Sequence, residues 1–302
     1  MKSEHKSGYV ALIGRPNAGK STLLNQILQT KLVAVTPRPQ TTRHRIFGVY
    51  DCQDAQIVFQ DTPGLLQPDD AMHEFMMREA NRALADADLA VWLIDGVKGV
   101  TKRENAIASK VLDGAPIPLL VVFNKMDVVP LDRRENLIKG IQNIPLPDRH
   151  ETFYISALEG GGVKELVEKI LSYMNPGPKF FPPDQLSDRT QRFFVEEIIR
   201  EQAFLNLKQE IPYSLAVQVE SMQEKENGVL SIQAALHVER DAQKRILIGK
   251  KGAMIKLIGT QAREEIERMT QQKVFLELWV RVSEHWRKRG DRLREFGFIE
   301  SD

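Results

Sequence analysis

The sequence predicts an α/β domain with a doubly wound, mostly parallel sheet, followed by a small α+β domain. Short apolar runs alternate with longer amphipathic stretches through residues 9–174. Four prolines and a glycine then interrupt this pattern at residues 175–188, and a different order of elements follows. The 302 residues are enough for two domains of medium size.

Five apolar runs are predicted to be strands that are buried on both faces of the first sheet. Each run is short, nearly continuous and rich in β-branched or aromatic residues, as is typical of parallel strands covered by helices. The runs lie at residues 9–14, 56–60, 89–95, 118–124 and 152–156. Helical patterns, such as those at residues 21–28 and 75–86, lie between the runs and complete a βαβ alternation.

The same patterns predict the domain boundaries. Residues 1–8 are expected to be a disordered polar tail, and residues 9–174 the first domain. Residues 175–188 are expected to be a linker, because proline ends one helix and prevents the next. In the second domain, residues 189–302, the predicted order is helix, strand, strand, helix, helix, strand and a short basic helix.

Composition excludes several classes of protein. The formal net charge is +1, so any contact with nucleic acid must come from a local basic patch. A single cysteine, Cys52, excludes an intramolecular disulfide and is typical of the cytoplasm. No apolar run reaches the roughly 18–20 residues that a membrane-spanning helix needs. The six histidines follow no zinc-binding pattern, and the first residues lack the apolar core of a signal peptide.

The segment GRPNAGKS at residues 14–21 satisfies the P-loop pattern G-x-x-x-x-G-K-[S/T] between a predicted strand and a predicted helix. Backbone N–H groups at a helix N-terminus would hold phosphate oxygens, while Lys20 neutralises phosphate charge and the Ser21 hydroxyl ligates Mg²⁺. The alternative is an ordinary strand-to-helix turn with an incidental lysine. The predicted phosphate-binding residues are Asn17, Ala18, Gly19, Lys20, Ser21 and Thr22.

Two further segments are predicted to complete the phosphate and metal site. In DTPG, Asp61 follows a strand and can hold a water on Mg²⁺, while Gly64 can offer its N–H to the γ-phosphate. Between this segment and the P-loop lies PRPQTTRHR, in which Thr42 is our choice for a switch threonine and Thr41 the near alternative. Both segments could also be plain polar turns. The predicted Mg²⁺ ligands are Ser21, Thr42 and Asp61, and the predicted catalytic residues are Lys20, Thr42, Gly64 and Asn17.

Two segments at later strand ends predict recognition of guanine. In NKMD, the Asp127 carboxylate can accept hydrogen bonds from guanine N1–H and the 2-amino group, which resembles the guanine-specificity motif of GTPases. SAL resembles the loop whose backbone N–H, here that of Ala157, contacts guanine O6. Open α/β sheets bind ligands at these strand ends. This pair of segments argues against a nucleotide kinase with an appended domain, which is the alternative function. The predicted base-binding residues are Asn124, Lys125, Asp127, Ser156, Ala157 and Leu158.

A GKKG turn lies between the two middle helices of the second domain. Small residues there would let a nucleic-acid backbone approach closely, as in the GXXG clamp of KH domains. The alternatives are a helix–helix turn with solvated lysines, or a protein- or membrane-docking domain that uses the basic tail at residues 286–294. The predicted RNA-binding residues are Arg240, Lys244, Arg245, Ile248, Gly249, Lys250, Lys251, Gly252, Met254 and Lys256.

Taken together, GRPNAGKSTLLN, QTTRHR, DTPGL, NKMD and SAL resemble the bacterial Era family, in the Era/tRNA-modification branch of GTPases. The segments SDRTQRFFVEEIIRE, PYSLAVQVE, ILIGKKGAMIKLIG and VFLELWVRV resemble that family's C-terminal type II KH domain. The resemblance runs from about residue 9 to residue 299. There is one small departure, Ala18, at a position where valine is common. Related GTPases with a second P-loop or a C-terminal cysteine motif fit poorly.

The resemblance implies a GTPase that binds GTP, GDP and Mg²⁺. It also implies binding to the 3′ end of small-subunit ribosomal RNA and a role in assembly of the 30S subunit. Peripheral association with the inner face of the cell membrane stays open beside a cytoplasmic location. We expect a monomer, because no heptad pattern or exposed apolar helix indicates an obligate dimer.

The catalytic water lacks its usual side chain. Ras-like enzymes orient this water with a glutamine directly after the DTxG segment, and Leu65 occupies that position here. Hydrolysis is therefore expected to be intrinsically slow, or to rely on backbone groups and ordered solvent. In related GTPases an asparagine at the position of Asn17 helps to hold K⁺. Our hypothesis is that K⁺ neutralises charge between the β- and γ-phosphates, and the alternative is that Asn17 only fits the turn.

Overall fold

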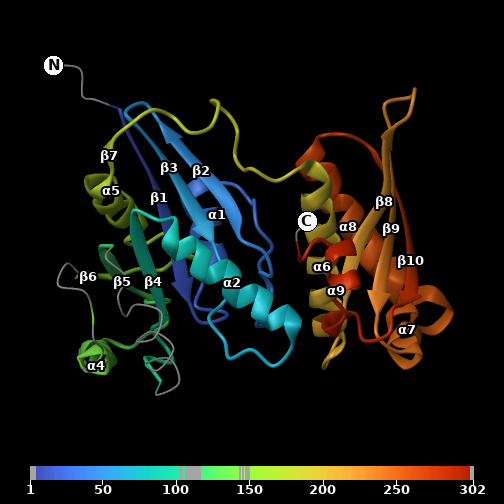
Figure 1. The fold of residues 1–302 in the computed structure, drawn as a ribbon, viewed down its shortest axis with the longest axis horizontal. Helices are drawn as coiled ribbons and strands as arrows, with labels where there is room; N and C mark the ends of the chain where they lie inside the picture. Colours follow the sequence, from blue (N-terminus) through green and yellow to red (C-terminus); the bar gives the residue numbers. More distant parts are fainter. Residues whose placement is uncertain are drawn as a thin grey trace. The chain divides into compact units, whose positions relative to one another are not determined.

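The computed structural model describes residues 5–101, 105, 117–142, 144, 146 and 150–299. The chain divides into two compact units (Figure 1). The first contains Met1–Pro68 and Met76–Asp188, and the second contains Asp69–Phe75 and Arg189–Asp302.

A mostly parallel sheet with strand order β2-β3-β1-β4-β5-β6 forms the centre of the first unit. Its strands are β1 (Lys6–Gly14), β2 (Ile46–Cys52), β3 (Ala55–Asp61), β4 (Leu89–Asp95), β5 (Leu119–Asn124) and β6 (His150–Tyr154). The associated helices are α1 (Lys20–Leu28), α2 (Ala71–Ala85), of which residues 76–85 belong to this unit, α4 (Leu131–Ile141) and α5 (Val163–Tyr173). Every residue of β3, β4 and β5 is buried, as predicted for strands covered on both faces. The same prediction is wrong for β6, which lies at the edge of the sheet and whose residues are partly or fully exposed. The doubly wound α/β prediction is confirmed.

Strand β2 was absent from the predicted set of strands. It pairs antiparallel with β3 at the edge of the sheet, and its burial is interrupted instead of being continuous. Gly48 and Asp51 lie within it, and both residue types are depleted in strands. An edge strand tolerates them because only one side of it is paired.

The prediction of a disordered tail over residues 1–8 is wrong for residues 6–8. Strand β1 begins at Lys6, where it pairs in parallel with Ala55 of β3. The first two residues of β1 also pair with β7 (Asn175–Pro176) in antiparallel orientation. Pairing on both sides therefore extends the strand into a polar stretch that has no apolar pattern of its own.

Residues 175–188, predicted to be a linker, pack against the first unit. The buried Gln56 side chain accepts hydrogen bonds from the N–H groups of Phe180 and Phe181, at 2.7 and 2.9 Å, and donates to the Phe181 carbonyl at 3.0 Å. The ring centroids of Tyr9 and Phe180 lie 4.8 Å apart. Proline prevents a helix here, but it permits an extended chain along the sheet.

The second unit has the predicted α+β order. Its elements are α6 (Gln191–Asn206), β8 (Ala216–Glu224), β9 (Leu230–Val238), α7 (Asp241–Ile248), α8 (Ala253–Thr270), β10 (Val274–Val282) and α9 (Gly290–Glu295), with short 3₁₀ turns at Ile211–Ser214, Lys250–Gly252 and Trp286–Lys288. The strand order is β10-β9-β8, in which β9 is parallel to β10 and antiparallel to β8. This arrangement confirms the predicted KH fold.

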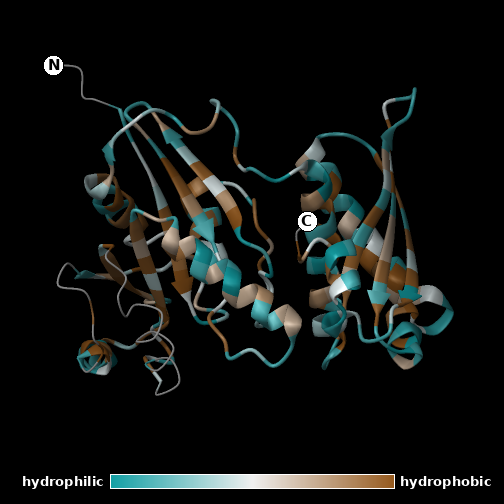
Figure 2. Ribbon diagram, viewed as in Figure 1, coloured by the Kyte–Doolittle hydropathy of each residue, from teal (hydrophilic) through white to brown (hydrophobic). Residues whose placement is uncertain are grey.

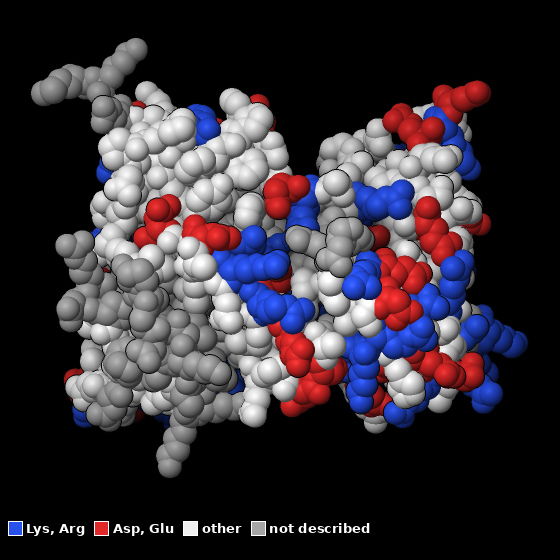
Figure 3. Space-filling view, in the orientation of Figure 1, with Lys and Arg blue, Asp and Glu red and all other residues white. Residues whose placement is uncertain are grey.

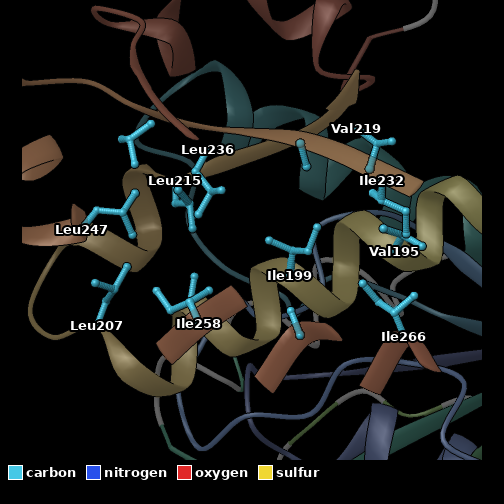
Figure 4. Close-up of a cluster of buried hydrophobic side chains, with 14 of the residues drawn as sticks. Val195, Ile199, Leu207, Leu215, Val219, Ile232, Leu236, Leu247, Ile258 and Ile266 are labelled. Atoms are coloured by element: carbon cyan, nitrogen blue, oxygen red, sulfur yellow. The ribbon is translucent and has the colours of Figure 1, made fainter. Parts of the chain in front are cut away.

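The core of the second unit is formed by the buried faces of its helices and of its sheet. The Thr190 hydroxyl accepts a hydrogen bond from the Phe193 N–H and caps α6, whose buried residues Val195 and Ile199 follow a helical spacing. Alternate residues of β9 face the same core. Figure 4 shows these side chains pointing toward Ile258 and Ile266 of α8. Figure 2 shows apolar residues along the strands and polar residues on the outer faces of the helices.

The basic tail at residues 286–294 is built into the second unit. The Trp286 side chain is fully buried, and its indole N–H donates to the Ser214 carbonyl at 2.8 Å. Arg287 lies 2.9 Å from Glu239, and Arg289 lies 2.6 Å from Asp291. These contacts argue against the tail as a docking element, because its tryptophan is buried and two of its arginines already pair with carboxylates. Among the described residues, no helix is both long and apolar enough to cross a membrane.

Candidate nucleotide and RNA sites

The P-loop connects the end of β1 to the start of α1 through three residues with positive φ. These are Gly14 at 145°, Asn17 at 65° and Gly19 at 102°. A Cβ at Gly19 would lie 2.1 Å from Asn124 Nδ2, so only glycine fits there. Lys20 Nζ donates to the carbonyls of Gly14 and Arg15 at 3.2 and 3.1 Å. The ammonium group is thereby held within the loop that the sequence predicts to surround phosphates.

The three predicted Mg²⁺ ligands converge on one point. Ser21 Oγ donates to Asp61 Oδ2 at 2.7 Å and lies 2.9 Å from Thr42 Oγ1, which is 3.3 Å from the same carboxylate oxygen. Asp61 is fully buried, and its Oδ1 has no hydrogen-bond partner in the part of the chain that the structure describes. Burial raises the pKa of Asp61, while Lys20 and the two hydroxyl groups oppose this shift.

This donor set fits a hydrated Mg²⁺ ion. Two hydroxyl groups and a buried carboxylate are oxygen donors, which Mg²⁺ prefers, and Mg²⁺ commonly completes its coordination with water and substrate phosphates. The described residues contain no cluster of three or more His, Cys, Asp or Glu side chains that could bind a metal by themselves. The unpartnered Oδ1 of Asp61 is a ready acceptor for a metal-bound water.

The two neighbouring threonines point in different directions. Thr41 Oγ1 lies 2.6 Å from Thr36 Oγ1 and donates to the Arg38 carbonyl at 3.0 Å, so it holds the turn of its own loop. Only Thr42 reaches Ser21 and Asp61. The structure therefore brings Thr42, and not Thr41, to the predicted metal site.

The phosphate cleft also contains residues that the sequence patterns did not single out. Ala34, Val35, Thr36 and Gln40 line it together with the P-loop, Thr41, Thr42 and Gly64. Their only signal in the sequence is their position between the P-loop helix and DTPG. Asn17 Nδ2 donates to the Pro37 carbonyl at 2.7 Å, which ties the P-loop to the same segment.

Gly64 and Leu65 hold the end of β3 against the P-loop. A Cβ at Gly64 would lie 2.4 Å from the backbone nitrogen of Pro16, so a side chain cannot be accommodated. The Leu65 N–H donates to the Gly14 carbonyl at 2.9 Å. The Leu65 side chain is buried and is not among the residues that line the cleft.

Asn124 joins the P-loop to the two segments predicted to bind the base. Its Nδ2 donates to the Ala18 carbonyl at 2.8 Å, and its Oδ1 accepts from the N–H groups of Lys125 and Ala157 at 2.7 and 2.8 Å. The Ala157 N–H, assigned to guanine O6 from the sequence, thus donates to Asn124 in this structure. The N–H of Leu158 has no acceptor in the described part of the chain.

Of the other residues predicted to contact the base, Asp127 has an exposed side chain, whereas the side chains of Lys125 and Ser156 contact other groups of the protein. The Asp127 carboxylate is exposed and makes no hydrogen bond within the described ranges. Lys125 Nζ lies 2.7 Å from Asp95 at the end of β4, a residue that the sequence patterns missed. Ser156 Oγ accepts from the Glu159 N–H at 3.1 Å and shapes the SAL turn. Asp127 is therefore the carboxylate available to a ligand here.

The GKKG turn has the backbone that its glycines require. Gly249, Lys251 and Gly252 have φ values of 74°, 52° and 79°. A Cβ at Gly249 would lie 2.8 Å from Met254 N, whereas a Cβ at Gly252 would meet nothing within 4 Å. Gly249 is thus needed for the turn itself, and Gly252 leaves an open surface above the backbone.

The cationic side chains predicted around the turn point to solvent. Figure 3 shows Lys and Arg side chains protruding where Figure 1 places α7. No carboxylate pairs with any of them among the residues that the structure describes. Five are exposed and Lys244 is partly exposed; the exposed five are Arg240, Arg245, Lys250, Lys251 and Lys256.

A cleft between α8 and β10 lies beside this basic surface. Its lining residues are Ile255, Lys256, Gly259, Thr260, Arg263, Leu276 and Leu278. Of the residues predicted to bind RNA, Lys256 lines this cleft, while Ile248 and Met254 lie outside its lining and pack partly buried against the core. The lining residues that the sequence did not single out carry one weak signal: a glycine, Gly259, stands within helix α8, and a Cβ there would lie 3.4 Å from Leu278 Cδ1.

Comparisons with known proteins match both units. A family model described as "50S ribosome-binding GTPase" matches residues 9–125, and a KH domain model matches residues 210–287. The chain is 44% identical to GTPase Era of Geobacter sp. (strain M21) over 298 residues, which cover 98% of this chain and 99% of the relative. It is 43% identical to GTPase Era of Thermotoga maritima over 284 residues, or 94% of each chain.

Two solved structures match over nearly the whole length. A crystal structure of Era in complex with MgGDPNP and nucleotides 1506–1542 of 16S ribosomal RNA has a TM-score of 0.93 and 38% identity, and covers 98% of this chain and 99% of that chain. An Aquifex aeolicus Era variant bound to GDP·AlF4⁻ has a TM-score of 0.92 and 38% identity, with coverage of 97% and 99%.

Proposed function

This chain belongs to the Era family of GTPases, and from that premise we propose that it is a GTP-hydrolysing switch that binds the 3′ end of small-subunit ribosomal RNA and assists assembly of the 30S subunit. The observation that carries the proposal is the convergence of Ser21, Thr42 and Asp61 beside the P-loop lysine. The related structure with Mg²⁺, a GTP analogue and 16S ribosomal RNA supports the same ligands.

At the phosphates, each side chain has a distinct task. The Ser21 and Thr42 hydroxyls would ligate Mg²⁺, and Asp61 would accept a hydrogen bond from a metal-bound water. Lys20 would exchange its two carbonyl acceptors for phosphate oxygens, while the Gly64 N–H would face the γ-phosphate. Mg²⁺, when bound, neutralises charge that develops on the phosphates.

At the base, Asp127 would accept the N1–H and 2-amino groups of guanine. The unused N–H of Leu158 is a second candidate, with that of Ala157, to donate to guanine O6. Asn124 would hold the three loops together, since its Nδ2 donates to one backbone carbonyl and its Oδ1 accepts from two backbone N–H groups. This division separates the residue that reads the base from the residue that positions the loops.

Catalysis is proposed to be slow without further help, because the buried Leu65 offers no hydrogen bond to the attacking water. Asn17 uses its Nδ2 on Pro37, which leaves Oδ1 as the atom that would ligate K⁺. We expect hydrolysis to be about tenfold faster in KCl than in NaCl at equal ionic strength, a change of about 1.4 kcal/mol in the barrier. The Asn17→Ala variant should lose this difference. Equal rates of the unmodified protein in the two salts would remove the K⁺ hypothesis.

In the second unit, the GKKG turn would hold an RNA backbone and the cleft between α8 and β10 would receive bases. The cationic side chains around the turn have no carboxylate partner among the described residues, which supports phosphate contact. Cysteine usage supports a cytoplasmic location, and a monomer stays a prediction. Peripheral membrane association has little support, because the tail that suggested it packs within its own unit.

Hydrolysis of GTP with and without small ribosomal subunits tests the proposed function. We expect slow, Mg²⁺-dependent release of phosphate from GTP alone and a faster rate when subunits are added. ATP in place of GTP is the control for base selection. Equal turnover of ATP would favour the kinase-like alternative, and a rate indifferent to both subunits and their 3′-terminal RNA would contradict the ribosomal role.

A further inference from the structure

The switch segment, residues 33–42, is fixed to helix α1 at both of its ends. At the far end, Thr42 Oγ1 lies 2.9 Å from Ser21 Oγ. At the near end, Asn25 Oδ1 accepts hydrogen bonds from the N–H groups of Leu32 and Val33, each at 3.0 Å, and Asn25 Nδ2 donates to the Val33 carbonyl at 2.9 Å. Ser21 and Asn25 are four residues apart, and therefore share one face of α1.

Asn25 has no direct part in the nucleotide site. It does not line the phosphate cleft, and its three hydrogen bonds all go to the backbone at the start of the switch segment. An amide that satisfies two N–H groups and one carbonyl replaces the backbone pairing that a strand or helix would supply. The segment thereby gains a defined starting point without any regular structure of its own.

This anchor bears on how readily Thr42 reaches the metal. With the anchor, the chain between Val33 and Pro37, whose carbonyl accepts from Asn17 Nδ2, comprises residues 34–36; without it, the free chain begins after Thr30, whose N–H donates to the Asn25 carbonyl at 3.2 Å. Ordering a longer free loop costs more conformational entropy. Only a nucleotide whose γ-phosphate and Mg²⁺ engage Thr42 has to meet that cost.

We propose that Asn25 is a positioning residue that presets the switch segment for GTP and so sets the preference for GTP over GDP. The inference rests on the assignment of Thr42 to the metal under the proposed function. The plainer alternative is that Asn25 merely completes the end of α1. In that case it would stabilise the fold equally in every nucleotide state.

Paired titrations with GDP and a non-hydrolysable GTP analogue, both with Mg²⁺, separate these readings. For Asn25→Ala we expect about tenfold weaker binding of the GTP analogue, with GDP affinity changed by less than about twofold. Faster amide hydrogen exchange at Leu32 and Val33 should accompany the change. The matched control is Gln26→Ala on the same helix, since the Gln26 amide makes no hydrogen bond among the described residues.

Equal losses of affinity for both nucleotides, together with a lower Tm, would overturn the inference in favour of the structural alternative. If Asn25→Ala fails to fold, Asn25→Asp keeps the side-chain volume but places a carboxylate oxygen against the Val33 carbonyl, and the same selective loss is expected. A separate result would contradict the premise that Thr42 binds the metal. If the unmodified protein shows no Mg²⁺-dependent difference in affinity between the two nucleotides, the assignment of Thr42 is wrong.

Discussion

Replacing Asp127 by asparagine should move the nucleotide preference from guanine to xanthine. The carboxylate accepts hydrogen bonds from guanine N1–H and the 2-amino group, whereas an asparagine amide presents a donor that faces the 2-oxo group of xanthine. The Asp127 side chain is exposed and makes no hydrogen bond within the described ranges, so its replacement should leave the surrounding loops intact. We expect Asp127→Asn to weaken GTP binding by about 100-fold or more and to strengthen XTP binding.

Titration of fluorescent, non-hydrolysable GTP and XTP analogues into the variant checks this result. The control is Asp132→Asn, which removes a nearby exposed carboxylate from the first turn of α4 and should change neither affinity. If Asp127→Asn bound guanine nucleotides as tightly as the unmodified protein, the assignment of the NKMD segment would be wrong.

Reversing the charge of the GKKG lysines should abolish most RNA binding. Lys250→Asp with Lys251→Asp replaces two exposed cations by two anions at the turn. Aspartate is among the few residues that tolerate the left-handed backbone found at Lys251, so the turn should survive. We expect affinity for a single-stranded RNA of the 16S 3′ end to fall about 100-fold, with a shallower dependence on salt.

The control for this double variant is Lys139→Asp with Lys164→Asp, two exposed lysines in the first unit. It makes the same change in net charge and should leave RNA affinity nearly unchanged. GTP hydrolysis without RNA should be equal in both double variants. Unaltered RNA binding by the GKKG variant would instead favour a docking role for the second unit.

The motifs of the nucleotide site are predictable from sequence because each is a short contiguous stretch with strict local demands. Gly19 and Gly249 must adopt positive φ, and any side chain there would collide with Asn124 or Met254. The buried strands are predictable for a similar reason, since their burial on both faces requires unbroken apolar runs. Strand β2 escapes prediction because an edge strand is exempt from that requirement.

Residue type and order along the chain thus determined the α/β and KH folds and the P-loop, and predicted which segments bind the metal and the base. Only the tertiary structure showed that Thr42, and not Thr41, lies at the predicted metal site. It also showed that the Ala157 N–H donates to Asn124, and that a cleft lies between α8 and β10 beside the GKKG turn. The reason is physical. These features depend on which side of a loop a hydroxyl or N–H faces once segments distant in sequence pack together, and neighbouring residues in a loop carry no periodic pattern that reveals it.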